Sequence, residues 1–348
     1  DRDRIDQVTW SGSNRLLVAA SWSEKYSKKR WRASRYFGIQ IDNNQVTEIL
    51  PPISKQAASW ERRMATRVRL VSTLPRDDEH ILVQAYDYKD RAQAVFKVNL
   101  ESNEFHKQFI NRYNVNSWYV DTNGEVIFGT GVKENEPEII QYWYKKPGTD
   151  KWNMIKEFKN MADDKFEPII VQGDKLWVKS DRELNRDSIW EFDPKTGEFG
   201  ELIYTHPKYD VSGVILDAER TRAIGVRYMA HYPESHYFDK KDSSLHQLVS
   251  NSFQGYNTFI ASRDLKNEKL LVMAYKNDSP LKYFWLDLAQ RSGGFWYSQY
   301  PYLEGHQLGK TEPFSYTARD GMELYGYLTM PPNIKPGEKP PLVIHPHG

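Results

Sequence analysis

Short apolar runs recur along the chain at nearly constant spacing. The intervals between their starting residues are 65, 45, 50, 47 and 47 residues. Intervals of ~40–50 residues are typical of one blade of a β-propeller, and all but the first interval fit. The six runs begin at Leu16, Ile81, Val126, Leu176, Ala223 and Leu270.

Each run is followed by a second strand, a polar turn and a third strand. In the last five repeats the second strand starts 12 or 13 residues after the first run. In the first repeat this offset is 21 residues, because a charged insert from Lys25 to Arg35 separates the two strands and is expected to form a loop. The third strands read VTEIL, FHKQFI, WNMIKEF, FGELIY and LHQLVS. One more short apolar segment precedes the first run, and four strands per repeat match a propeller blade.

The repeat therefore predicts an all-β fold, a β-propeller of at least six four-stranded blades. A β-sandwich of similar strands rarely repeats one strand order six times. Neighbouring blades must stack, since no single blade can bury both of its faces. We assign residues 1–302 to the propeller, with blades near 4–50, 66–110, 115–158, 166–204, 211–250 and 256–300. One or two further blades upstream are compatible with this pattern.

The repeat stops after Tyr302, and residues 303–348 follow a different pattern. Two strand-like runs flank Arg319-Asp320-Gly321, and Asp-Gly is a strong signal for a hairpin turn. A Pro- and Gly-rich connection leads to the apolar run Leu342-Val343-Ile344, which we expect to be a buried strand. These residues predict a linker and the first strands of another domain.

The strings TARDGMELYGYLTMPP and PLVIHPHG carry a family resemblance. They resemble the beginning of the α/β-hydrolase domain in the prolyl oligopeptidase family, and most closely its acylaminoacyl-peptidase and dipeptidyl-aminopeptidase-like branch. The resemblance implies a truncated α/β-hydrolase domain after the propeller. It also implies that the intact parent is a serine peptidase acting on peptides. The propeller would then cover the active site and limit access to short or unstructured chains.

The resemblance places no catalytic residue in this chain. The nucleophile of such hydrolases lies in a G-x-S-x-G elbow, and no such pentapeptide occurs here. The triad runs in the order Ser, Asp or Glu, then His, so all three members are expected after Gly348. Only His347 and Gly348 represent the oxyanion-hole turn, and an ordinary strand-end turn is the alternative for them. We expect the chain alone to be inactive.

Composition argues against several classes of partner and of active site. Lys and Arg number 48 and Asp and Glu 47, so we expect no nucleic-acid partner. The absence of cysteine excludes disulfides and cysteine nucleophiles, and it suits either the cytosol or an exported protein. No run approaches the ~18–20 apolar residues that span a bilayer. The chain begins at Asp1 rather than at Met, and we expect upstream sequence to have been removed or omitted.

No cofactor or metal is expected either. His231 and His236 are close in sequence, and His345 and His347 alternate along one strand. Neither pair has an evident third and fourth ligand for zinc.

Two basic segments are candidates for gating the substrate or contacting the hydrolase domain. Arg30 and Trp31 lie in the charged insert, and Arg62 and Arg63 lie in the connection to the second blade. Loops that a rigid scaffold positions often carry binding residues. Solvated loops are the alternative interpretation of both segments.

Two alternative functions stay open. One is a non-catalytic propeller that binds a protein or a glycan, and the other is a hydrolase of the same family that acts on non-peptide esters. A coding sequence that continues past Gly348 with Gly-Pro and a later G-x-S-x-G elbow would favour the peptidase. The expected partners are peptide substrates and the chain's own hydrolase domain, and a homo-oligomer is also compatible with the sequence.

Overall fold

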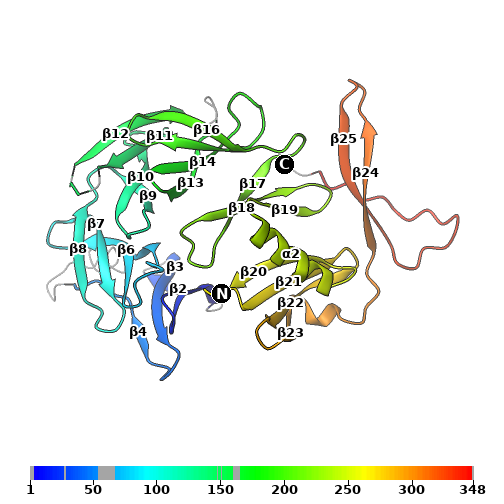
Figure 1. Ribbon diagram of the computed structural model, residues 1–348, viewed down its shortest axis with the longest axis horizontal. Coiled ribbons are helices and arrows are strands. Elements are labelled where there is room, and N and C mark those ends of the chain that lie inside the picture. The colour runs from blue at the N-terminus through cyan, green and yellow to red at the C-terminus, as the bar shows by residue number, and fades with distance from the viewer. Residues whose placement is uncertain are drawn as a thin grey trace. The chain divides into compact units, whose positions relative to one another are not determined.

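The computed structural model describes residues 4–26, 29–53, 67–146, 148–149, 151–159 and 165–346, with the side chains of residues 24–31 outside this description. Within these ranges the regular elements are strands, apart from one α-helix and one short 3-10 helix. The architecture is a six-blade β-propeller followed by a hairpin, so the predicted all-β propeller is confirmed (Figure 1). Five of the sheets have the four strands predicted for a blade, whereas the sheet of the fifth repeat has three. The chain divides into two compact units, residues 1–229 and 230–348.

The first unit holds four four-stranded sheets whose strand order follows the sequence. The first sheet comprises β1 (Arg4–Trp10), β2 (Arg15–Tyr26), β3 (Lys29–Gln40) and β4 (Val46–Glu48). The second comprises β5 (Arg69–Ser72), β6 (His80–Asp87), β7 (Ala92–Asn99) and β8 (Phe105–Ile110). The third comprises β9 (Val115–Val120), β10 (Val126–Lys133), β11 (Glu136–Lys145) and β12 (Trp152–Lys159). The fourth comprises β13 (Glu167–Gln172), β14 (Lys175–Ser180), β15 (Ser188–Asp193) and β16 (Glu198–Tyr204). The unit ends with the antiparallel pair β17 (Val211–Leu216) and β18 (Ala223–Met229).

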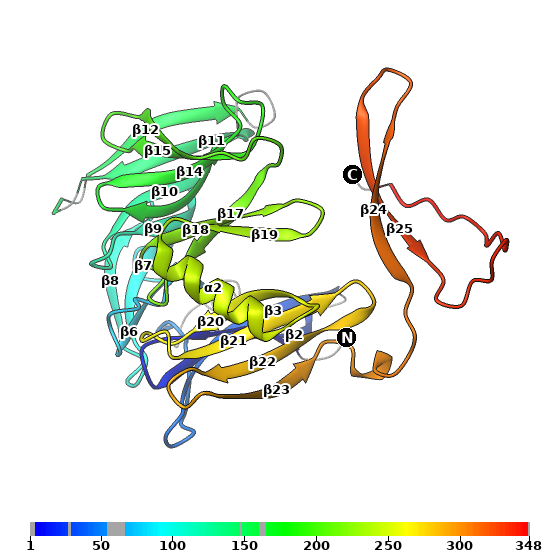
Figure 2. The same ribbon diagram turned by 45° about the vertical axis from the view of Figure 1, so that its right-hand side comes forward.

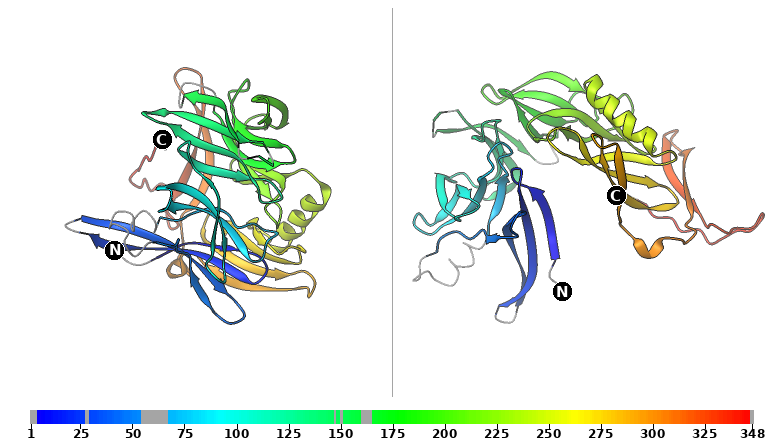
Figure 3. Two further views of the ribbon diagram at one scale, coloured as in Figure 1. Left: turned by 90° about the vertical axis from the view of Figure 1, so that its left-hand side faces the viewer. Right: turned by 60° about the horizontal axis from the view of Figure 1, so that its bottom comes forward.

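The charged insert of the first repeat continues the β2–β3 hairpin, so its prediction as a loop is wrong. The antiparallel register runs without a break from Arg15 opposite Gln40 to Tyr26 opposite Lys29. Because no bulge interrupts this register, the backbone hydrogen bonds carry both strands into the insert. Figure 3 shows the pair in blue as a long two-stranded ribbon.

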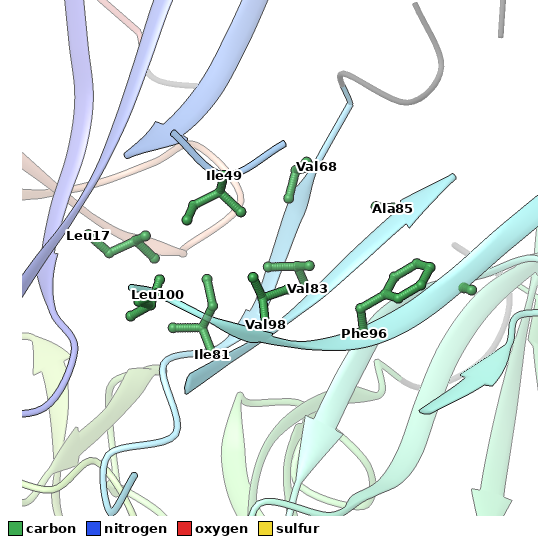
Figure 4. Packing of buried hydrophobic residues seen from close by; sticks show 10 residues of the cluster. Leu17, Ile49, Val68, Ile81, Val83, Ala85, Phe96, Val98 and Leu100 are labelled. Carbon is green, nitrogen blue, oxygen red and sulfur yellow. The ribbon is translucent and has the colours of Figure 1, made fainter. Parts of the chain in front are cut away.

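Each sheet of the first unit packs its apolar face against the next sheet. Between the first two sheets, Leu17 and Ile49 meet Ile81, Val83 and Val98, all at most 1% exposed (Figure 4). Three further clusters join the second sheet to the third, the third to the fourth, and the fourth to β17 and β18. This pairwise burial is the physical reason for the repeat, because an apolar face of one sheet is covered only by its neighbour.

The second unit contains one sheet, one helix and one hairpin (Figure 2). Its elements are β19 (Pro233–Tyr237), α2 (Lys240–Ser252), β20 (Asn257–Arg263), β21 (Lys269–Lys276), β22 (Ser279–Asp287), β23 (Ser292–Ser298), the 3-10 helix Pro301–Leu303, β24 (Lys310–Thr317) and β25 (Glu323–Met330). Strands β20 to β23 form a four-stranded antiparallel sheet, and β24 pairs with β25.

The segment LHQLVS, predicted as a strand, lies in α2, so that prediction is wrong. The carboxylate of Asp239 caps the helix by accepting a hydrogen bond from Asp242 N at 2.9 Å. Leu245 and Val249 are four residues apart, which places both on one face of a helix. That face packs on the sheet β20–β23, where Val249 is fully buried against Ile260.

The hairpin predicted around Arg319-Asp320-Gly321 is present as β24 and β25. Gly321 has a φ of +84°, a left-handed conformation that glycine adopts at little cost. The apolar run after it was predicted as a buried strand, and this prediction is wrong. Leu342, Val343 and Ile344 are 75%, 86% and 77% exposed and belong to no strand, since no neighbouring strand in the described ranges pairs with them.

Candidate functional site

A pocket of about 890 Å³ lies among the first strands of five consecutive repeats. Each of these strands contributes to the wall, through side chains that include Thr9, Ser72, Tyr119, Val171 and Leu216. The first strands of propeller blades surround the central channel, so this pocket is a part of that channel. All of its lining residues belong to the first unit.

One end of the pocket is formed by turns that join first strands to second strands. Lining residues come from the β5–β6, β9–β10 and β17–β18 turns. These turns bring acidic and basic side chains to the same end, including Asp78, Glu79, Asp121, Arg76 and Arg220. Away from these turns the wall is mixed, with the apolar residues Ile169 and Ile170 beside polar ones such as Gln7, Thr9 and Gln108.

Three turns between first and second strands share one local geometry centred on an aspartate, and two of them, β9–β10 and β17–β18, line the pocket. Asp121, Asp217 and Asp264 each follow a first strand, and each carboxylate accepts a hydrogen bond from the backbone N–H four residues later, at 2.7–2.9 Å. The residue three positions after each aspartate has a left-handed backbone. These left-handed residues are Gly124, Arg220 and Asn267, with φ of +81°, +59° and +56°. A carboxylate that closes its own turn makes the turn stiff without using a strand partner.

The carboxylate of Asp77 is held as an anion at the edge of the pocket. Burial opposes its ionisation, but three donors to its oxygens outweigh the burial. They are Lys97 Nζ at 2.8 Å, His80 Nδ1 at 2.9 Å and the backbone N–H of Glu79 at 3.0 Å. They hold the pKa of the Asp77 carboxyl well below its usual value. Lys97 also lines the pocket, so its cationic head is fixed there by Asp77.

The structure does not bring the predicted gating residues to this end of the pocket. Arg30 and Trp31 belong to β3, close to its junction with β2, although their side chains are outside the description. In an antiparallel sheet that junction lies at the opposite end of the strands from the β1–β2 turn. Arg62 and Arg63 lie outside the described residues, as do His347 and Gly348.

The pocket is the feature that sequence reasoning missed. Its walls come from five repeats, so no local motif marks it. A signal was nevertheless available in the turns, because an aspartate three residues before Gly124, Arg220 or Asn267 recurs at the same place in three repeats. Asp and Asn side chains accept hydrogen bonds from the backbone of their own turn, so an aspartate that recurs at one position predicts a shared turn geometry.

The described residues also bear on hydrolytic and metal chemistry. The described residues lining the pocket include no histidine, so they supply no serine–histidine pair for nucleophilic catalysis. Three or more His, Asp or Glu side chains do not gather anywhere in the described ranges in a way that could hold a metal ion. None of the helices described is both long and apolar enough to cross a bilayer.

Neither a family model nor a curated protein matches the sequence. Solved structures with a similar fold do exist. A prolyl endopeptidase aligns with 96% of this chain at 10% identity and a TM-score of 0.58. Prolyl oligopeptidase B from Galerina marginata aligns with 96% at 10% identity and a TM-score of 0.56, and oligopeptidase B from Leishmania major with 97% at 8% and 0.53. The chain spans 47% of the length of each of these three proteins.

Proposed function

We propose that this chain is the propeller region of a serine peptidase that hydrolyses peptides. The observation that carries the proposal is the likeness of its fold, over nearly its whole length, to peptidase structures of about twice that length. At about 10% identity this likeness concerns the fold, and the activity is inferred from it together with the C-terminal motifs.

The exposure of the C-terminal segment supports the same proposal. On the hairpin, Tyr316, Tyr325 and Tyr327 are 53%, 48% and 54% exposed, and the run from Leu342 to Ile344 is at least 75% exposed. Apolar surface gathered on one segment usually marks a surface that another module covers.

The chemistry would then reside in the hydrolase domain. A serine is acylated by the peptide carbonyl, the amine leaves, and water hydrolyses the acyl-enzyme with histidine as the proton carrier. A backbone N–H near Gly348 would face the oxyanion of each tetrahedral intermediate. The same proposal assigns the parent to the acylaminoacyl-peptidase and dipeptidyl-aminopeptidase-like branch, and it assigns Arg30, Trp31, Arg62 and Arg63 to substrate gating or contact with the hydrolase domain.

The decisive experiment compares this chain with a longer protein translated past Gly348. Each is incubated with aminoacyl and peptidyl p-nitroanilides and with a serine-directed fluorophosphonate probe. We expect turnover and probe labelling from the longer protein only, and loss of both when the serine of its G-x-S-x-G elbow is changed to alanine. A longer protein that neither turns over substrate nor takes the probe would favour the protein- or glycan-binding module. Turnover of p-nitrophenyl esters without peptide cleavage would favour the esterase.

A further inference from the structure

A histidine closes the connection between β16 and β17. Nδ1 of His206 accepts hydrogen bonds from the backbone N–H groups of Lys208 and Tyr209, at 3.1 and 3.0 Å. Side-chain oxygens of Asp77 and Asn99 accept the same pair of bonds in two other turns, from the residues two and three positions later, at 2.9–3.0 Å. The imidazole therefore does in this connection what a carboxylate or an amide does in the other two turns.

The two bonds fix the protonation of the imidazole. A backbone N–H can only donate, so Nδ1 of His206 must offer a lone pair, and the one ring proton lies on Nε2. A protonated imidazole carries an N–H at both nitrogens, and its Nδ1–H would then face two other N–H groups. The closed connection thus requires a neutral His206. The oxygens of Asp77 and Asn99 stay acceptors over the pH range in which histidines titrate.

The same imidazole packs against two tyrosine rings. Its centroid lies 4.9 Å from that of Tyr209 and 4.5 Å from that of Tyr228, with interplanar angles of 28° and 30°. Tyr228 belongs to β18 and lies opposite Val211, the first residue of β17. The ring therefore ties the connection to the sheet of the fifth repeat. Tyrosines titrate near pH 10, so neither phenol changes charge where a histidine does.

The charged side chains around this connection do not offset a proton on the imidazole. Those on the segments that meet here are Lys208, Asp210, Arg186, Asp187 and Arg227. Both acids among them are engaged elsewhere: Asp187 pairs with Lys165 Nζ at 2.6 Å, and Asp210 accepts the backbone N–H of Asp187 at 2.8 Å. A proton on His206 would add to an excess of cations.

We propose that His206 makes the β16–β17 connection a pH-sensitive switch, closed while the imidazole is neutral and open once it is protonated. Opening frees the N–H groups of Lys208 and Tyr209 and releases the imidazole from Tyr228. The switch acts where the fourth repeat passes into the fifth. The apolar cluster that joins these repeats, which includes Ile189 and Val211, contains no group that titrates in this range, so the fold persists. This inference concerns the propeller alone and holds whether or not the chain is part of a peptidase.

Hydrogen–deuterium exchange of the whole chain, followed by mass spectrometry, measures the opening. Exchange is compared at about pH 7.5 and about pH 5.5, on either side of the ordinary histidine titration, and is corrected for its intrinsic pH dependence. The informative peptide spans residues 205–211, and the peptide 98–104 with the Asn99 turn is the internal reference. We expect protection of the first peptide to fall about three- to tenfold at the lower pH, the range that the loss of one hydrogen bond allows. The reference should keep its protection.

Three variants separate the imidazole from the rest of the connection. His206→Asn keeps an acceptor but removes the titration, so peptide 205–211 should be protected equally at both pH values. His206→Ala removes the acceptor, and the peptide should exchange readily at both. His106→Asn is the matched control, because His106 lies in β8 with its side chain 63% exposed. It should leave the pH response of peptide 205–211 unchanged.

The proposal is overturned if the native chain protects peptide 205–211 equally at both pH values. It is also overturned if His206→Asn keeps the pH response, since another group would then cause it, or if His206→Ala stays protected. A parallel loss of protection in the Asn99 turn would show general loosening in acid and would equally exclude a local switch. None of these outcomes depends on peptidase activity.

Discussion

Replacing Gly124 with alanine tests the turn geometry that builds the end of the pocket. Gly124 has a φ of +81°, and a left-handed conformation costs an L-residue about 1 kcal/mol. The added Cβ would also lie 2.7 Å from Cδ2 of Leu74, a buried side chain on the pocket wall. Forcing a packed side chain to move costs a further ~1–3 kcal/mol. We therefore expect Gly124→Ala to lower the free energy of unfolding by about 2–4 kcal/mol.

Urea unfolding of the two variants Gly124→Ala and Gly173→Ala separates the two causes. Gly173 has a φ of +65°, but no atom lies within 4 Å of its added Cβ. It should therefore show the backbone cost of about 1 kcal/mol alone. The denaturant slope should be the same in both variants and in the parent chain. Equal losses in the two variants would refute the contact with Leu74 as a cause, and no loss in either would refute the backbone argument as well.

Three further predictions concern single side chains. Tyr142→Phe should lower the free energy of unfolding in urea by ~1–2 kcal/mol, because the buried Phe166 carbonyl loses the hydroxyl that donates to it at 2.9 Å; an unchanged urea midpoint would contradict this. Asp242→Ala should lower the free energy of unfolding by ~3 kcal/mol, because the Arg263 side chain, which is 7% exposed, loses its carboxylate partner and keeps only the hydrogen bond to Asn267 Oδ1; a loss below ~1 kcal/mol would show that Asn267 and water replace the carboxylate. The depressed pKa of Asp77 means that the unfolded chain binds the proton more readily, so this carboxylate stabilises the fold above pH ~4 and ceases to do so as the pH falls through its folded pKa. Asp77→Asn should therefore flatten the acid side of the stability profile, and an unaltered profile would exclude the mechanism.

The repeat was predictable because the burial that causes it is local to neighbouring sheets. Apolar runs such as the one at Ile81 alternate with polar turns at a fixed period, and the fold keeps that period. The helix α2 was not predicted, since position in the repeat suggested a strand there. Its own signals were the capping Asp239 and the spacing of Leu245 and Val249, and these local preferences outweigh the repeat.

The candidate site was less predictable because its parts are brought together only by the fold. Arg76 and Arg220 line the same end of the pocket from the second and the fifth repeat, and neither lies in a motif that indicates the other. The gating candidates were selected from charge and position in long connections, and their role stays a prediction. The aspartate of each turn was visible in the sequence. The turn also needs a residue with a left-handed backbone three positions later, and a residue such as Arg220 gives no sign of that conformation in the sequence.

The exposed C-terminal run has a practical consequence for handling this polypeptide. Leu342, Val343 and Ile344 form a short aliphatic stretch that is at least 75% exposed and belongs to none of the strands described. Such a stretch in one molecule can pair edge to edge with the same stretch in another. Sedimentation of the purified polypeptide should therefore show a monomer that gives way to larger species as protein is concentrated, and a charged residue in place of Val343 should keep it dispersed.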